Sequence, residues 1–221
     1  MRMAVISRIS ILLLAATLTA APAPAFPQPP GSREAALAAL ASPDAATRAE
    51  AIVWIANRGA MADAPLLHER LRDESALVRG YAEQGLWLLW SRSGDPEIDR
   101  LMLRGTEEMQ SGDLAKAVST FSEIINSRPE FAEGWNRRAT AHYLAGDYRN
   151  SIADCAEVLK RNSRHFGALS GLGQIHFALG ELARALEWYR RALEVNPNMV
   201  GVELNIKAIE ERLAERRPRS T

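Results

Sequence analysis

The stretch LSGLGQIHFALGELARALEWYRRALEVNP, residues 169–197, decides the fold. Its apolar side chains recur every three or four residues on both sides of Gly180, which is the spacing of two amphipathic helices. A glycine suits the left-handed backbone position just past a helix end. The stretch therefore predicts a helical hairpin that turns at Gly180.

The same pattern occurs twice more upstream, displaced each time by 34 residues. Three kinds of position keep their character: a turn glycine, a small residue early in the second helix, and apolar residues along that helix. They are Gly112, Gly146 and Gly180; Ala117, Ser151 and Ala185; and Phe121, Cys155 and Tyr189, with Val118, Ile152 and Leu186. Asp147, after its glycine, can cap the second helix of its unit. Such hairpins must bury one face against a neighbour, so the units should stack.

This unit resembles the tetratricopeptide repeat (TPR), a 34-residue helix–turn–helix. The third unit matches the family pattern best, at Leu169, Gly173, Phe177, Gly180, Ala185, Tyr189, Ala192 and Pro197. The predicted TPR segment is 95–199, with repeats at about 98–131, 132–165 and 166–199. The resemblance implies a right-handed superhelix whose first helices line a concave surface that binds peptides or partner proteins.

Residues 33–94 show a different repeat, at a shift of 31, which aligns Arg48 with Arg79. Each copy has an acidic loop, with Asp44 or Asp73, before a helix that carries the arginine. This plan resembles a HEAT-type repeat, whose loop aspartates and helix arginines make contacts along the stack. Two generic helical hairpins are the alternative. The sequence thus predicts an all-α solenoid of two HEAT-like units, three TPR units and a capping helix.

The N-terminal residues show no helical repeat and differ in composition from the rest of the chain. Residues 1–25 contain Arg2 and Arg8, the apolar run ISILLLAATLTAA, and small residues at Ala23-Pro24-Ala25. This order predicts a secretory signal peptide; an uncleaved membrane anchor is the alternative, although the run is short for a bilayer. Residues 26–32 predict a Pro-rich linker.

The C-terminal end predicts a helix that closes the stack. Residues 200–217 carry a narrow apolar stripe beside charged positions, as a terminal helix with one solvated face requires. Residues 218–221 form a tail after Pro218. At the other boundary, Asp95-Pro96 predicts a helix start directly after the first repeat segment, so the two segments should adjoin without a long linker.

The composition argues against several classes of function. Lys and Arg total 27 and so do Asp and Glu, which gives no net field for nucleic acid or for an anionic membrane. Cys155 is the single cysteine, so no intramolecular disulfide can form. Because it lies between apolar helical positions, we expect a buried thiol rather than a nucleophile.

The glycines of residues 165–182 suggest a phosphate-binding loop, but that motif needs a preceding strand and a Gly-Lys-Ser/Thr ending, and neither is present. Gly173 takes the small position of the family. Gly167 and Gly171 lie one turn apart on the face expected to line the groove, and each costs a helix about 1 kcal/mol relative to alanine. Either a ligand segment approaches them closely, or they allow tight packing of Tyr143.

We therefore predict a docking surface on the concave side of the second and third TPR units. Its candidate residues are Asn136, Arg137, Thr140, Tyr143, Gly167, Ser170, Gly171, Gln174 and Phe177. Chaperone-binding members of the family hold a C-terminal carboxylate in a clamp of lysine, asparagine and arginine. The corresponding first-repeat positions here are Met102 and Thr106, so we expect that clamp to be absent.

Five polar residues depart from the family pattern: two arginines, and Glu108, His142 and His176 in place of an aromatic residue. Arg104 and Arg138 replace apolar residues, and each must reach solvent or a carboxylate. His142 and His176 could suggest a metal pair. Equivalent helices of stacked units lie roughly 8–10 Å apart, which is too far for a shared ion without distortion, so we expect histidines of the core or rim.

Three tryptophans, Trp54, Trp87 and Trp90, could form a platform for an aromatic or carbohydrate ligand. Burial between hairpins is the expected alternative, because large rings dominate core contacts.

The sequence as a whole predicts a non-enzymatic interaction module of the cell envelope, periplasmic in a Gram-negative host. It should bind a protein or peptide partner, with no cofactor, no metal, no nucleic acid and no membrane insertion after signal cleavage. Two alternatives are open. One is a HEAT-type enzyme such as a lyase that uses a groove carboxylate or Cys155, and the other is an assembly factor that pairs with its own copy as a homodimer.

Overall fold

The computed structural model describes residues 29–215, and these form α-helices and one short 3-10 helix with no β-strand. The predicted all-α solenoid is thereby confirmed. The predicted signal peptide, the first three residues of the linker and the last six residues lie outside the described range. Within that range, none of the helices combines the length and hydropathy needed to cross a bilayer.

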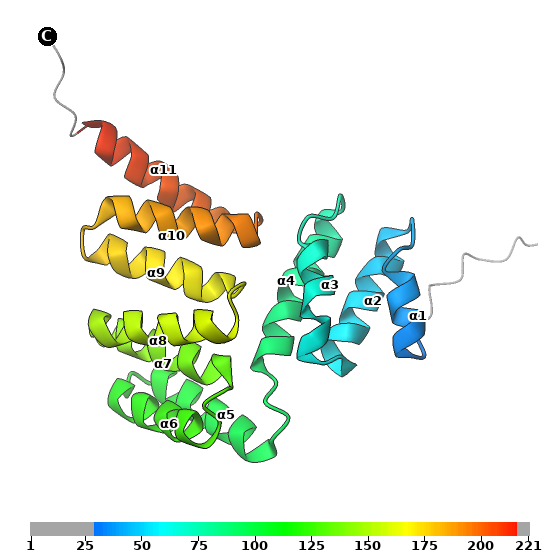
Figure 1. The fold of residues 1–221 in the computed structure, drawn as a ribbon, viewed down its shortest axis with the longest axis horizontal. Helices are drawn as coiled ribbons and strands as arrows, with labels where there is room; N and C mark the ends of the chain where they lie inside the picture. Colours follow the sequence, from blue (N-terminus) through cyan, green and yellow to red (C-terminus); the bar gives the residue numbers. More distant parts are fainter. Residues whose placement is uncertain (1–28, 216–221) are drawn as a thin grey trace, which may run out of the picture.

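The helices form two stacks (Figure 1). The first stack contains α1 (Arg33–Ala39), α2 (Ala45–Arg58), the 3-10 helix η1 (Met61–Asp63), α3 (Ala64–Arg70) and α4 (Ala76–Ser91). The second contains α5 (Pro96–Gln110), α6 (Leu114–Ser127), α7 (Ala132–Leu144), α8 (Tyr148–Arg161), α9 (Phe166–Ala178), α10 (Leu182–Val195) and α11 (Val200–Glu215). Figure 1 shows the first stack standing beside the second, with its helices running crosswise to α7–α10.

The turns inside the second stack are built as predicted. Gly112, Gly146 and Gly180 have φ angles of 83°, 78° and 75°, the left-handed region that favours glycine. Directly after the first two, Asp113 and Asp147 accept a hydrogen bond from a backbone N–H in the first turn of α6 and α8. Local chemistry therefore fixes where each hairpin turns.

The closing helix α11 packs on α10 through the predicted apolar stripe. Val202 and Ile209 are buried, and Ile206 and Leu213 are half-buried in the same cluster. The rest of α11 is mostly exposed, so this helix ends the second stack with a solvated face.

Within each hairpin, a small residue on the first helix opposes a residue of the second helix that fills the space. A Cβ at Gly105 would lie 2.6 Å from the ring of Phe121, and one at Gly173 would lie 2.4 Å from the ring of Tyr189. No side chain larger than hydrogen fits opposite these buried rings. The middle repeat, 132–165, differs, and this difference shapes the candidate site described below.

Arginines connect the loops of the first stack. Arg48 makes a two-pronged contact with Asp73, at 2.7 and 2.9 Å, and donates to the carbonyls of Ser42 and Pro43. Asp44, the other aspartate of the HEAT-like pattern, instead caps α2 by accepting from the backbone N–H of Thr47. The predicted aspartate–arginine contact is present for one of the two aspartates.

Arg79 makes the same two contacts to loop carbonyls as Arg48, but its remaining side-chain partner lies in the second stack. It donates to the carbonyls of Asp73 and Glu74, as Arg48 does to those 31 residues earlier, and its Nε donates to Oδ1 of Asn198 at 2.9 Å. Asn198 also donates to the carbonyl of Leu71. The first stack is thus continued in space by the turn before α11, which is more than 100 residues away in the chain.

An aromatic cluster fills the junction between the stacks. Trp90 stacks on His165 with centroids 4.3 Å apart, and Trp87 meets Phe166 edge to face at 5.2 Å. Phe166 belongs to the same core cluster as the buried residues of α1–α4. The expectation that Trp87 and Trp90 are packed between hairpins is confirmed, since Trp90 is 3% exposed, Trp87 is half-buried, and both rings meet the start of α9. The third, Trp54, is half-buried on α2.

The junction should weaken in acid because of His68, which lies beside Trp90 at the stack boundary. Burial, followed by the charges of Arg164, His165 and Arg72, lowers the pKa of His68 to about 4. The unfolded chain binds a proton near pH 6.5 and the folded chain does not, so stability is complete above that pH and falls between pH 6.5 and about 4. At about 1.4 kcal/mol per pKa unit, the loss is on the order of 3–4 kcal/mol.

Urea unfolding at a series of pH values measures this loss, and His68→Leu should flatten the dependence between pH 6.5 and 4.5. Equal slopes for the wild type and the variant would contradict the assignment to His68.

Candidate functional site

The concave side of the middle and last repeats contains a small hollow of about 60 Å³. It lies between α7 and α9, with α8 beneath. Its lining is made of Asn136, Ala139, Thr140, Tyr143, Ser151, Cys155, Gly167, Gly171, Gln174 and Ile175. The structure thus brings together six of the nine predicted groove residues: Asn136, Thr140, Tyr143, Gly167, Gly171 and Gln174.

The hollow exists because the middle repeat lacks a large ring. Cys155 occupies the position that Phe121 and Tyr189 hold in the other two repeats, and Ala139 opposes it where they face glycine. A Cβ at Gly171 would meet only the Sγ of Cys155, at 3.8 Å, which is ordinary van der Waals contact. The space above the thiol therefore stays open toward the groove.

Gly167 has a different reason to be glycine. A Cβ there would lie 2.3 Å from Cη2 of Trp87 on α4, so the close approach comes from the first stack of the same chain. The nearest neighbours of a Cβ at Gly167 would be Trp87 and His165, and a Cβ at Gly171 would have no atom of Tyr143 within 4 Å. The alternative that the glycine serves the packing of Tyr143 is therefore wrong for Gly171.

Helix α4 extends the groove by forming a wall at one end. A second, more open hollow of about 400 Å³ adjoins the first and shares Asn136, Thr140 and Gly167 with it. Its other lining residues are Glu83 and Trp87 of α4, with Arg137, Phe166, Ser170 and Met199. Both stacks thus contribute to one continuous concave surface.

A buried carboxylate organises the polar side of this surface. Glu133 is 1% exposed, lies 3.2 Å from Nε2 of His165, accepts from Asn136, and pairs with Arg137 at 2.8 Å. His165 also caps α9, since its Nδ1 accepts from the backbone N–H of Ala168, which places its proton on Nε2. Burial alone would raise the pKa of Glu133, but the hydrogen bond to His165, the nearby positive charges and Asn136 hold that pKa below its usual value.

The remaining predicted residues are placed less centrally. Thr140 and Ser170 donate their hydroxyls to carbonyls of their own helices, which leaves their oxygens as acceptors toward the groove. Gln174 is exposed at the rim. Phe177 lies at the far end of α9, is 41% exposed, and lines neither hollow.

Sequence reasoning missed Glu83, Trp87, Glu133 and His165 as components of this surface. Trp87 and Glu83 lie in the other repeat segment, and no periodicity connects the two segments. Glu133 is 34 residues before Gly167, so the repeat alignment places both at one structural position. That alignment was the available signal, but it gives no indication that the carboxylate is buried.

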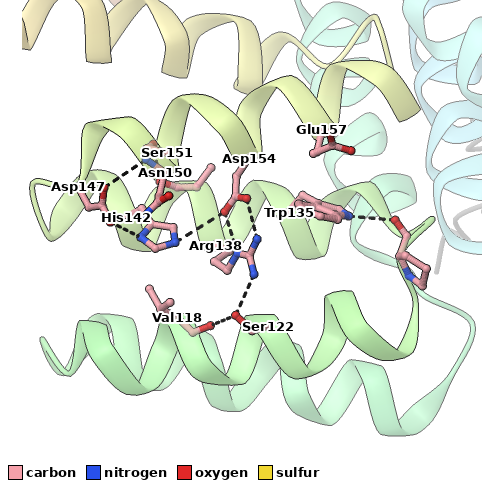
Figure 2. A network of polar contacts seen from close by, with 12 residues as sticks. Val118, Ser122, Trp135, Arg138, His142, Asp147, Asn150, Ser151, Asp154 and Glu157 are labelled. Atoms are coloured by element: carbon pink, nitrogen blue, oxygen red, sulfur yellow. Dashed lines mark hydrogen bonds and ion pairs between the residues drawn. The ribbon is translucent and has the colours of Figure 1, made fainter.

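Beside the groove, an ion pair braces the first and middle repeats (Figure 2). Arg138 makes two contacts of 2.8 Å with Asp154 and one of 2.9 Å with the Oγ of Ser122, so it links α6, α7 and α8. Its guanidinium also lies 5.1 Å from the ring centre of Trp135. In the preceding repeat, Arg104 reaches Glu123 at 3.1 Å. The expectation that each arginine reaches solvent or a carboxylate is confirmed, and in both cases the structure provides a carboxylate.

The two candidate metal-pair histidines bind acidic residues of their own turns. His142 lies 3.4 Å from Asp147, as Figure 2 shows, and His176 lies 2.6 Å from Glu181. Among residues 29–215, no group of three or more potential ligands is arranged to hold a metal ion. Both histidines thus fasten the end of one helix to the start of the next.

Cys155 is buried, as expected, at 3% exposure. Burial, with a smaller effect of the Asp154 charge, raises its pKa to about 12. The reactive form of cysteine is the thiolate, so this thiol is unsuited to nucleophilic chemistry at neutral pH.

Comparison with known proteins gives one consistent result. A family model described as "Tetratricopeptide repeat" matches residues 102–159 and 145–199. A "TPR repeat-containing protein" of Rhizobium etli is 31% identical over 185 residues, which covers 80% of this chain and 89% of that protein. An alignment of that extent must reach into the first stack. "Tetratricopeptide repeat protein 12" of Mus musculus is 30% identical over 101 residues, 46% of this chain and 14% of that protein.

Solved TPR structures share the fold over somewhat more than half of this chain. The first TPR of Spaghetti (RPAP3), bound to the HSP90 peptide SRMEEVD, has a TM-score of 0.51 at 24% identity and covers 53% of this chain and 93% of that one. The Sgt2 TPR domain from Aspergillus fumigatus has a TM-score of 0.53 at 20% identity, over 57% of this chain and 87% of that one. At these identities the likeness concerns the fold.

The two groove glycines should respond in opposite ways to the same substitution. Gly167→Ala forces its methyl group against Trp87 and should destabilise the protein by about 1–3 kcal/mol, as overpacking does. Gly171→Ala makes only an ordinary van der Waals contact with Cys155 and should stabilise the protein by up to about 1 kcal/mol through helix propensity. Thermal unfolding of both variants measures the difference, and a Gly167→Ala protein as stable as the wild type would refute the Trp87 contact.

Proposed function

Since this chain belongs to the tetratricopeptide repeat family, we propose that it is an exported adaptor, without catalysis of its own, that binds an extended segment of a protein partner. The binding surface is the groove whose floor is α7 and α9 and whose end wall is α4. The observation that carries the proposal is the open hollow above Cys155, since it gives the concave surface one defined place for a side chain.

The hollow limits the chemistry of the segment that binds. Its volume of about 60 Å³ suits one small aliphatic side chain, because a single water occupies roughly 30 Å³ of liquid. Its floor is Ala139, Cys155 and Ile175, and its rim offers the amides of Asn136 and Gln174 to a peptide backbone. The expected ligand is an extended segment with a small apolar residue at its centre.

The groove differs from those that bind chaperone termini. The Spaghetti domain is bound to an acidic HSP90 peptide, and the TPR2B domain of yeast Sti1, at 24% identity and a TM-score of 0.50, is in complex with an Hsp70 segment. Here Met102 is buried and Thr106 donates its hydroxyl to the carbonyl of Met102. These side chains offer no cation to a terminal carboxylate, so we expect an internal segment as the ligand.

Two alternatives are less well supported. A lyase-like activity through Cys155 would need an exposed thiolate, whereas this thiol is buried with a raised pKa. Self-association as a homodimer would make the groove an interface between copies. Light scattering of the purified protein distinguishes such a dimer from a monomeric adaptor.

Selection of peptides from a phage-displayed library on the wild-type protein, followed by fluorescence anisotropy with the selected peptide, tests the groove. Gly171→Leu fills the hollow without a backbone clash and should weaken binding at least about tenfold, or about 1.4 kcal/mol. Gly201→Leu is the matched control, since that glycine lies on α11 with nothing near its Cβ position. Unchanged binding by a folded Gly171→Leu protein would reject the groove as the site.

The export part of the proposal is supported by Arg2 and Arg8, the apolar run after them, and the small residues that end at Ala25. Fusion of residues 1–32 to alkaline phosphatase, which is active only after export, should give active enzyme in a Gram-negative periplasm. N-terminal sequencing of the exported fusion should begin at Phe26. A reporter that stays inactive in the cytoplasm would reject export.

A further inference from the structure

A second groove runs along the first stack, on a different face of α4 from the one that meets the second stack. It has a volume of about 680 Å³, which is in the range of ligand-binding clefts. Its lining consists of Pro29, of Ala46, Ala49, Glu50, Val53, Trp54, Asn57 and Arg58 on α2, and of Leu77 and Tyr81 on α4.

Large apolar side chains line the groove and remain exposed to solvent instead of packing in the core. Val53, Leu77 and Tyr81 are 40%, 51% and 39% exposed, whereas the opposite faces of α2 and α4 supply fully buried core residues such as Ile52 and Leu86. A contiguous apolar patch with a polar rim is typical of a surface that something covers. Here the rim carries Glu50, Asn57 and Arg58.

The lining contains one residue from outside the two helices, and it is a proline. Pro29 is the first described residue, so the chain enters the first stack at this groove. The segment that leads into it is Phe26-Pro27-Gln28-Pro29-Pro30, with three prolines among five residues. Such segments favour the extended polyproline II conformation, which aromatic-lined grooves bind through ring contacts. Trp54 and Tyr81 supply those rings.

The reach of the segment matches the width of the groove. Three residues, the number from 26 to 28, would span about 9 Å if they adopted polyproline II, at 3.1 Å per residue. Packed helices lie roughly 8–10 Å apart between axes, so a segment anchored at Pro29 can cross from one wall to the other. The unpaired backbone carbonyls of this conformation need donors, and Asn57 and Arg58 on the rim can provide them.

We infer that the groove between α2 and α4 is a polyproline-binding site and that the chain's own Phe26–Pro30 segment occupies it. Attachment at Pro29 gives the segment a high effective concentration at the groove, so it competes with any proline-rich segment supplied from outside. This site is separate from the hollow over Cys155, and its test does not depend on the proposed function.

Fluorine NMR of the full chain with 5-fluorotryptophan tests the assignment, with the Trp54 resonance identified by Trp54→Phe. The double substitution Phe26→Ala/Pro27→Ala should empty the groove and shift the Trp54 resonance. The resonance of Trp188, on α10, should stay in place. A synthetic peptide of residues 25–31, AFPQPPG, should then bind the double variant saturably and return the Trp54 signal toward its wild-type position, while leaving the wild-type protein unchanged.

A matched pair of exposed leucines separates the groove from a general apolar effect. In the double variant, Leu77→Ser should weaken peptide binding at least about fivefold, whereas Leu103→Ser on α5, where the leucine is 61% exposed, should not change it. An unmoved Trp54 signal after Phe26→Ala/Pro27→Ala would overturn the proposal. So would equal binding of the peptide to the wild type, which means an empty groove, or a Trp54 shift that tracks dimer formation in sedimentation.

Discussion

The two helices of each hairpin approach as closely as the pair of residues between them allows, and the position of the groove follows from that distance. Where Phe121 or Tyr189 fills the space, only a glycine fits on the opposing helix. In the middle repeat both members of the pair are small, Ala139 and Cys155, and the volume that a ring would fill becomes a hollow. Close packing between paired helices thus fills the interior of the first and third repeats and leaves a hollow in the middle repeat, open to the concave surface.

The junction between the stacks turns two short solenoids into one molecule. Trp90 stacks on His165, Trp87 presses against Gly167, and Arg79 continues the loop contacts of the first stack onto Asn198. These contacts bury large rings that would otherwise stay exposed on α4. They also place α4 across one end of the groove, so the N-terminal segment helps to define what the second stack can bind.

Much of the fold could be predicted because its signals are local. A positive φ at Gly146 and the cap at Asp147 depend on residues only a few positions away, and the 34-residue period repeats these signals three times. The site was predicted in part. Gly171 was identified because a glycine inside a helix is costly and needs a reason. Packing of Trp87 between hairpins was predicted, but its neighbour Phe166 was not, because apolarity predicts burial but not the partner.

The sequence by itself determined the helical hairpins, their number, their turns and the face that becomes concave, since each depends on spacing within one 34-residue unit. Only the tertiary structure decided that α4 closes the groove, that Glu133 is buried beside His165, and that a hollow opens above Cys155. The physical reason is that these features depend on volumes and charges brought together from distant segments. A linear pattern encodes the periodicity of one helix but not the space left between three.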